Sequence, residues 1–270
     1  MTRYAVIGTP ISHSKSPLIH RLFAEQTNQD VQYEAIEVQA DDFDSFVTDF
    51  FAANGGGLNV TVPHKERAHK IAQLLAPNAK LAGAVNTLYL NKENVLCGDN
   101  TDGRGLVRDI QNNHEIQIAG KRVLVIGAGG AVRGALVALI DAKPATLTIV
   151  NRTLEKAEQL RLIFEIQLAI ETSSFEQLDG EFDLVINGTS LGLSGETPPI
   201  LASHLSPNAC CYDMMYGNED TAFVAWAKNN GAVKALDGLG MLVEQAAESF
   251  LLWRGVRPET EPVISKLRNQ

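Results

Sequence analysis

The stretch that decides the fold is Val123-Leu124-Val125-Ile126-Gly127-Ala128-Gly129-Gly130-Ala131. Its first four residues are apolar, which is typical of a strand buried on both faces of a parallel sheet. Glycines follow directly, and the pattern from about Gly130 to Asp141 predicts a helix. A strand, a glycine turn and a helix in this order favour a dinucleotide-binding βαβ unit, because glycines let the backbone approach a pyrophosphate at the helix N-terminus.

The residues after the next predicted strand, Leu147–Val150, bear on which dinucleotide binds. A cofactor with a free ribose usually meets Asp or Glu about 20 residues past the glycines. Here the chain reads Asn151-Arg152-Thr153, with Lys156 one turn further on. Two cations and no acid favour a 2′-phosphate, so the sequence predicts NADP. Two alternatives stay open: a glycine turn without a ligand, since Val132 replaces the strict third glycine, and Thr153 as a helix cap beside solvated basic residues.

Outward from this unit, strand-like and helix-like stretches alternate, which predicts an α/β protein with largely parallel sheets. Before residue 103 we expect strands at Tyr4–Ile7, Val31–Val38, Leu58–Val60, Val85–Leu90 and Val95–Cys97, and helices at Pro17–Asn28, Asp42–Ala53 and Lys65–Leu75. Later strands are expected at Asp183–Ile186, Ala209–Asp213 and Val233–Ala235, and a last strong helix at Met241–Trp253. The domain boundaries are placed near residues 103 and 238.

Composition excludes several classes of protein. The 270 residues are 45% hydrophobic and 20% charged, with a net charge of −9, as in a globular protein that does not bind nucleic acid backbones in general. No apolar run reaches the length of a membrane span, and the N-terminus lacks the features of a signal peptide. The three cysteines form no CxxC motif, and we expect them reduced in a cytoplasmic protein that uses no metal.

Two polar segments carry candidate catalytic residues. Lys65 lies in the first turn of its predicted helix, where a cation opposes the helix dipole, and function is expected where a local rule is broken. Asp102 follows Thr101 at a helix start, where helix capping is the alternative explanation. Ser16-Pro17 predicts an N-cap followed by proline, although the hydroxyls of Ser14 and Ser16 equally suit a substrate carboxylate.

Taken together, these motifs resemble those of bacterial shikimate dehydrogenases along the whole chain. The matching segments are Ser14-Lys15-Ser16-Pro17, Asn59-Val60-Thr61-Val62-Pro63-His64-Lys65, Ala82-Gly83-Ala84-Val85-Asn86-Thr87, Asn100-Thr101-Asp102-Gly103, Gly127–Ala131, Asn151-Arg152-Thr153, Tyr212-Asp213-Met214 and Asp237-Gly238-Leu239-Gly240-Met241. The resemblance implies NADPH-dependent reduction of 3-dehydroshikimate to shikimate in aromatic amino-acid biosynthesis. It also implies a substrate domain of residues 1–103, joined by C-terminal helices of residues 239–270, and a Rossmann-like, doubly wound NADP domain of residues 104–238, with a cleft between them.

The resemblance further implies a role for individual residues. Lys65 and Asp102 would be the catalytic pair, in which Lys65 paired with Asp102 supplies a proton while hydride reaches the ketone carbon; which of the two is the immediate donor is left open. Substrate contacts are expected from Ser14, Ser16, Asn59, Thr61, Asn86, Tyr216 and Gln245. Cofactor contacts are expected from Gly127, Ala128, Gly129, Gly130, Ala131, Asn151, Arg152, Thr153, Lys156, Thr189, Met214, Gly238 and Met241.

Two other functions remain open at this point. A quinate/shikimate dehydrogenase accepts an extra hydroxyl and often uses NAD, and Arg152 and Thr153 in place of an Asp argue against it. Lys156, where the family often has arginine, leaves room for a softer NADP preference. A catalytically silent NADP-binding sensor is the other alternative, and the presence of both Lys65 and Asp102 argues against it. We expect a monomer or a homodimer with a small-molecule substrate and no membrane partner.

Overall fold

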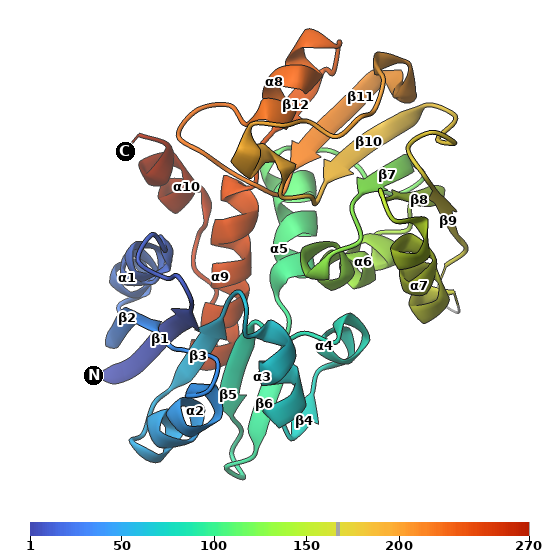
Figure 1. Ribbon diagram of the computed structural model, residues 1–270. Helices are drawn as coiled ribbons and strands as arrows, with labels where there is room; N and C mark the ends of the chain where they lie inside the picture. Colours follow the sequence, from blue (N-terminus) through green and yellow to red (C-terminus); the bar gives the residue numbers. More distant parts are fainter. Residues whose placement is uncertain (166–167, 270) are drawn as a thin grey trace. The chain divides into compact units, whose positions relative to one another are not determined.

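The structure is a computed structural model that describes residues 1–165 and 168–269. By its internal contacts the chain forms two compact units. Unit 1 consists of Met1–Gly105 together with Val243–Gln270, and unit 2 consists of Leu106–Leu242. Two helices, α5 (Asp102–Arg108) and α9 (Leu239–Arg254), therefore contribute residues to both units (Figure 1). In the described part of the chain, no helix is long and apolar enough to cross a membrane.

Unit 1 is built on a mixed sheet of six strands in the order β2-β1-β3-β5-β6-β4. The strands are β1 (Thr2–Gly8), β2 (Val31–Glu37), β3 (Gly57–Val60), β4 (Leu74–Leu75), β5 (Thr87–Leu90) and β6 (Leu96–Asp99). Strand β5 runs antiparallel to both neighbours, and the other pairs are parallel. Strands β1, β3 and β6 therefore end at the same edge of the sheet, where β5 begins.

The two faces of this sheet are covered by different helices. On one face α2 (Phe43–Ala52) packs Phe43, Val47 and Phe50 against Ala5, Ile7, Leu58 and Leu88. Because side chains alternate along a strand, Tyr4 points to the other face. There its ring lies 4.8 Å from Trp253 of α9, and Phe23 of α1 (Ser16–Thr27) lies 5.8 Å from Phe250. The remaining helices of unit 1 are α3 (Lys65–Ile71), α4 (Pro77–Ala82) and α10 (Glu261–Arg268).

Unit 2 contains a fully parallel sheet in the order β12-β11-β10-β7-β8-β9. The strands are β7 (Arg122–Ile126), β8 (Thr146–Val150), β9 (Ile170–Ser173), β10 (Phe182–Asn187), β11 (Leu205–Asp213) and β12 (Lys234–Leu236). From β7 the chain proceeds to β8 and β9 on one side and later to β10, β11 and β12 on the other. This reversal defines a doubly wound sheet, whose ligands bind at the carboxyl ends of the strands near the switch point. The predicted α/β class with a doubly wound domain is confirmed.

The helices of unit 2 are α6 (Gly130–Asp141), α7 (Leu154–Phe164) and α8 (Ala222–Asn229). The short η1 segment (Asp109–Asn113) continues α5 with π-helical geometry. Two short 3-10 turns, η2 (Leu191–Ser194) and η3 (Ala202–His204), complete the described elements of this unit.

Among the details of the sequence prediction that were wrong, two concern the ends of helices. The helix expected at Lys65–Leu75 ends at Ile71, because Ala72 is extended and Leu74–Leu75 pairs in parallel with Cys97 and Gly98 of β6. The predicted N-cap Ser16 is instead the first residue of α1, whose N-cap is Lys15. The Ser14 hydroxyl accepts a hydrogen bond from the Ser16 N–H at 3.3 Å. The side chain that binds the start of α1 is therefore that of Ser14, the residue before the N-cap Lys15.

Candidate active site

A lysine–aspartate ion pair lies at the strand-end edge of unit 1. Lys65 begins α3 shortly after β3, and Asp102 begins α5 shortly after β6. Because these two strands run in the same direction, residues 37 positions apart meet, and Lys65 Nζ lies 2.6 Å from Asp102 Oδ2. The two side chains are 27% and 11% exposed, so the pair is shielded yet still accessible to a small molecule.

Asn86 fixes the orientation of the Asp102 carboxylate. Its Oδ1 accepts the Thr101 backbone N–H at 2.9 Å, and because this group can only donate, the amide orientation is determined. The amide nitrogen then faces Asp102 Oδ1 at 2.7 Å and the Thr101 hydroxyl at 2.9 Å. Asn86 is buried, and both of its amide protons have protein partners. Asn86 thus supports the Asp102 carboxylate, and the substrate contact that the resemblance implies for it stays a prediction.

Asn59 is likewise engaged by protein groups. Its Oδ1 accepts the Tyr33 hydroxyl at 2.7 Å, and its Nδ2 donates to Ser249 Oγ at 2.9 Å. A second acceptor for this nitrogen is the Asn86 carbonyl oxygen at 3.2 Å. Asn59 is thus a buried support for neighbouring groups of the site.

The other predicted substrate residues lie partly in unit 1 and partly in unit 2. Gln245 Oε1 lies 3.5 Å from Asn86 Nδ2, and α9 approaches α5 so closely that a Cβ on Gly105 would lie 2.7 Å from the Gln245 backbone nitrogen. Thr61 follows β3, and its methyl group packs on Gly8 at the end of β1. Ser14 and Ser16 stand after β1, at the same edge of the sheet. Tyr216 belongs to unit 2, where burial, followed by the charge of Asp237, raises the pKa of its hydroxyl.

The glycine turn of unit 2 fits a pyrophosphate. Gly127 has a φ of +105°, a conformation that favours glycine, and an added Cβ would also make a tight contact of 3.1 Å with the Thr189 methyl carbon. Gly129 and Gly130 face open space: an added Cβ at either would have no atom within 4 Å. Gly129 is the N-cap of α6, and it provides no side-chain cap for the first N–H groups of the helix. Ala128 and Ala131 lie in the same turn and first helical residues.

The predicted 2′-phosphate residues follow β8. Arg152, Thr153 and Lys156 are exposed, and Asn151 donates its Nδ2 to the Thr153 carbonyl oxygen at 2.7 Å. No ion pair joins Arg152 or Lys156 to other residues that the structure describes. Thr153 is the N-cap of α7, but its side chain makes no capping hydrogen bond. Thr153 thus occupies the N-cap position of α7, as the capping alternative expects, but its hydroxyl does not cap the helix.

The residues predicted to line the nicotinamide lie at the carboxyl ends of β10, β11 and β12. Thr189 is held by Asn187, whose Oδ1 accepts its N–H at 3.1 Å and its hydroxyl at 2.7 Å. Met214 packs against Gly188, and Gly238 lies so close to the Met214 carbonyl group that no side chain would fit there. Met241 is buried in the first turn of α9. Together with Gly127, these residues form one edge of the unit 2 sheet.

Sequence reasoning missed the support that Asn187 and Asp213 give to this edge. Asp213 Oδ1 accepts Asn187 Nδ2 and the Met215 N–H, both at 3.1 Å, and Oδ2 accepts the Thr221 hydroxyl at 2.6 Å. Burial raises the pKa of the Asp213 carboxyl, which these donors partly oppose. An asparagine directly after a predicted apolar strand was the available signal.

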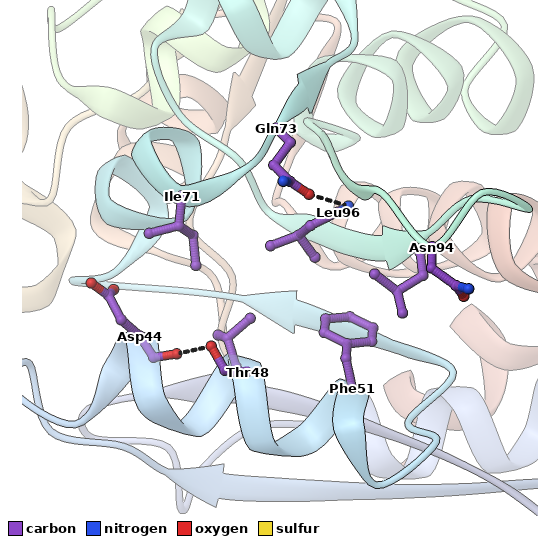
Figure 2. Close-up of a pocket in the computed structure, with 9 residues that line it drawn as sticks. Asp44, Thr48, Phe51, Ile71, Gln73, Asn94 and Leu96 are labelled. Atoms are coloured by element: carbon purple, nitrogen blue, oxygen red, sulfur yellow. Dashed lines mark hydrogen bonds between the residues drawn. The ribbon is translucent and has the colours of Figure 1, made fainter.

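A separate cavity of about 300 Å³ lies elsewhere in unit 1 (Figure 2). Its walls are mostly apolar, formed by Val47, Phe51, Ile71, Leu90 and Leu96, and its lining contains none of the predicted site residues. Two of its polar side chains are engaged: the Asp44 carboxylate binds Arg67, and Gln73 Oε1 accepts the Leu96 N–H at 3.0 Å. This cavity offers no group poised for proton transfer.

Neither thiol nor metal chemistry is apparent in the described part of the chain. Cys97, Cys210 and Cys211 are free and buried, and burial raises the pKa of the Cys211 thiol to about 12. Among residues 1–165 and 168–269, no three or more His, Cys, Asp or Glu side chains are grouped so as to hold a metal ion.

Comparisons with known proteins agree with this geometry. Residues 6–88 match the shikimate dehydrogenase substrate binding domain, residues 109–204 match shikimate/quinate 5-dehydrogenase, and residues 238–268 match the shikimate 5′-dehydrogenase C-terminal domain. A shikimate dehydrogenase (NADP(+)) of Alkalilimnicola ehrlichii is 57% identical over 266 residues, which is 98% of each chain.

Solved structures give the same result. An Ael1 enzyme from Pseudomonas putida is 46% identical with a TM-score of 0.94, over 99% of this chain and 98% of that one. Shikimate 5-dehydrogenase from Thermus thermophilus, solved with NADP(H) and shikimate, is 30% identical with a TM-score of 0.88, over 100% of this chain and 99% of that one. These matches confirm the resemblance seen in the motifs: the chain belongs to the shikimate dehydrogenase family.

Proposed function

We propose that the protein catalyses the reversible, NADPH-dependent reduction of 3-dehydroshikimate to shikimate in aromatic amino-acid biosynthesis, in the cytoplasm. The observation that carries the proposal is the contact of 2.6 Å between Lys65 Nζ and Asp102 Oδ2 at the strand-end edge of unit 1. A positioned proton donor is what reduction of a ketone to an alcohol requires from the protein. Family membership supplies the identity of the ketone.

In the proposed mechanism, NADPH supplies the hydride when it is bound. Lys65 donates a proton to the oxygen that gains charge, and positioned acid catalysis of this kind typically contributes about 10²–10⁴ in rate. Asp102 receives N–H donors on both carboxylate oxygens, from Asn86 and from Lys65. The Asp102 carboxylate is thus fixed by Asn86 on one oxygen, and Lys65 lies against the other. We therefore assign Lys65 as the immediate donor and Asp102 as the group that orients it.

The residues of unit 2 fit an NADP molecule. The open space at Gly129 and Gly130, next to the uncapped start of α6, accommodates a pyrophosphate. Arg152, Thr153 and Lys156, exposed after β8, would hold the 2′-phosphate.

In unit 1, Ser14 and Ser16 would bind the substrate carboxylate.

The direct test is absorbance-monitored oxidation of shikimate and of quinate by the purified protein, each with NADP and with NAD. We expect rapid turnover only with shikimate and NADP. Absence of turnover in all four combinations, with NADP binding retained in a separate titration, would instead support the silent sensor.

One observation keeps the broader quinate/shikimate activity as the second candidate. Lys156 provides a single charge where arginine provides a planar fork, so NADP is held with less geometric selectivity. Comparable rates with quinate or with NAD in the same assay would establish that activity.

A further inference from the structure

Ser249 of α9 lies at the centre of a buried hydrogen-bond network in unit 1. We propose that Ser249 is a positioning residue for the Lys65–Asp102 pair, acting through Thr87 and Asn86. This inference rests on the proposed function, because the pair it positions is the proposed proton-transfer group.

Ser249 brings together side chains from three other parts of unit 1. The residue is fully buried, as are Thr87 and Thr101. Its Oγ lies 2.9 Å from Asn59 Nδ2 of β3 and 2.8 Å from Thr87 Oγ1 of β5. Thr101 Oγ1, just before α5, lies 3.4 Å away. Ser249 therefore links the C-terminal helix to the strand ends that carry the site.

The donors and acceptors available to these side chains allow the network to run in one direction. Thr87 donates its only hydroxyl proton to Asn86 Oδ1 at 2.8 Å. Either hydroxyl can donate in the contact with Ser249. With Thr87 donating to Asn86, the Ser249 proton fills this contact, which at 2.8 Å is shorter than the 3.2 Å from Ser249 Oγ to the Gln245 carbonyl oxygen within the helix. Asn59 Nδ2 in turn donates to Ser249. The donors thus run from Asn59 through Ser249 and Thr87 to Asn86.

The same direction continues into the ion pair. Asn86 donates to Asp102 Oδ1 at 2.7 Å, and the other carboxylate oxygen accepts Lys65. Hydrogen bonds in a buried chain polarise one another, so each donor strengthens the next one. The Ser249 hydroxyl therefore contributes to the hold on Asp102 without touching it.

The residue type at this position is explained by the network. The buried residues of α9 nearest to Ser249 in the sequence, Ala246, Ala247 and Phe250, are apolar. A hydroxyl buried among them costs free energy unless it is hydrogen-bonded, and alanine is the better helix former. A serine serves here because its Oγ both accepts from Asn59 and donates to Thr87.

The first experiment measures steady-state kinetics of shikimate oxidation for Ser249→Ala, Thr87→Val and their combination. Thr87→Ser keeps the hydroxyl and is the conservative control, and Ser265→Ala removes an exposed helical hydroxyl of α10. We expect each single hydroxyl loss to lower kcat by about three- to tenfold, with KM for shikimate and for NADP within about twofold. Because the Ser249 and Thr87 hydroxyls act through one series of hydrogen bonds, kcat of the double variant should resemble that of the slower single variant. The kcat values of Thr87→Ser and Ser265→Ala should match that of the wild type.

A purely structural role gives a different result. In that case the melting temperature falls but kcat stays within twofold of the wild type, or the effects of the two variants multiply; either result overturns the proposal.

A second readout does not depend on activity. In the free protein, the side-chain amide NMR signals of Asn59 and Asn86 report the two ends of the chain. We expect Ser249→Ala to shift both sets of signals and to speed proton exchange at the Asn86 amide. A change confined to Asn59 contradicts the proposal. If the wild type shows no shikimate turnover, the proposed function fails, and these spectra still decide whether Ser249 positions Asn86.

Discussion

At the level of single residues, the ion pair explains why a cation stands in the first turn of α3. Such a cation is unfavourable for the isolated helix. Here Lys65 is held by Asp102 of another element, and Asp102 is in turn held by Asn86. The local cost is thus offset by a contact that no local pattern reveals.

Replacing Lys65 by alanine removes the proposed proton donor. We expect Lys65→Ala to lower kcat by about 10²–10⁴, while KM for shikimate changes only a few-fold. Lys70→Ala, on the exposed face of the same helix, is the matched control and should behave as the wild type. Steady-state kinetics of both variants make the comparison, and near-normal turnover of Lys65→Ala would exclude Lys65 from the mechanism.

His20 is expected to make stability depend on pH. It is fully buried, its ring stacks 4.0 Å from Tyr33, and burial lowers its pKa from 6.5 to about 3, a shift that Asn59 partly opposes. A base with a lowered folded-state pKa stabilises the fold fully above its unfolded pKa, and this stability is lost as pH falls toward the folded pKa. Between pH 6.5 and 3 the wild type should therefore lose about 1.4 kcal/mol per pH unit more than His20→Phe.

Urea unfolding of both proteins at pH 7, 5.5 and 4 measures this difference. Every titratable group other than His20 is present in both proteins, so the contributions of those groups cancel in the comparison. Parallel pH dependence of the two unfolding free energies would show that His20 is not buried in its neutral form.

At the level of elements, the glycines of the turn between β7 and α6 serve different purposes: Gly127 is needed for the backbone conformation, and Gly129 for the space proposed for the cofactor. Gly129 has an ordinary φ of −85°, and an added Cβ there meets no atom within 4 Å. Gly129→Ala should therefore leave the melting temperature unchanged while raising KM for NADP about tenfold or more, because the methyl group occupies the space proposed for the pyrophosphate. Gly127→Ala, at a φ of +105°, should lower the melting temperature as well.

Thermal unfolding without ligand and cofactor titration of the two variants test this distinction. An unaltered KM for NADP in Gly129→Ala would place the cofactor away from this turn.

The same elements show what a sequence alone reveals. β7, the glycine turn and α6 were predicted because each has its own local pattern: an apolar run, glycines and helical periodicity. β4 was missed because Leu74 and Leu75 also continue an apolar helix face, and only pairing with β6 makes them a strand. Lys65 was singled out because a cation in the first turn of a helix is unusual, whereas Asp102 has an ordinary capping explanation and was paired with Lys65 through the family resemblance. Ser249 gave no signal, because one serine on an apolar helix face is unremarkable until its partners from β3 and β5 are known.

At the level of the whole molecule, the two units differ in how the chain builds them. Unit 2 is one continuous segment, whereas unit 1 needs both ends of the chain. In unit 1, Trp253 and Phe250 of α9 pack on Tyr4 and Phe23, and Gly57 leaves no room for a side chain against the Trp253 indole. Phe250 is buried and Trp253 is half-buried. Losing a buried Phe side chain typically costs about 3–5 kcal/mol, and losing the Trp253 contacts adds to this, against a whole stability of about 5–15 kcal/mol for a domain.

We therefore expect the fragment 106–242 to fold alone and the fragment 1–105 to remain unfolded. Far-ultraviolet circular dichroism and thermal unfolding of the purified fragments distinguish these outcomes, and the folded fragment should bind NADP in a titration. Because Gly105 lies against Gln245, a flexible linker of about six residues can join residue 105 to residue 243. This fusion should restore cooperative unfolding, since it returns Phe250 and Trp253 to their contacts. Cooperative unfolding of 1–105 without the C-terminal segment would show that unit 1 folds without the contacts of α9.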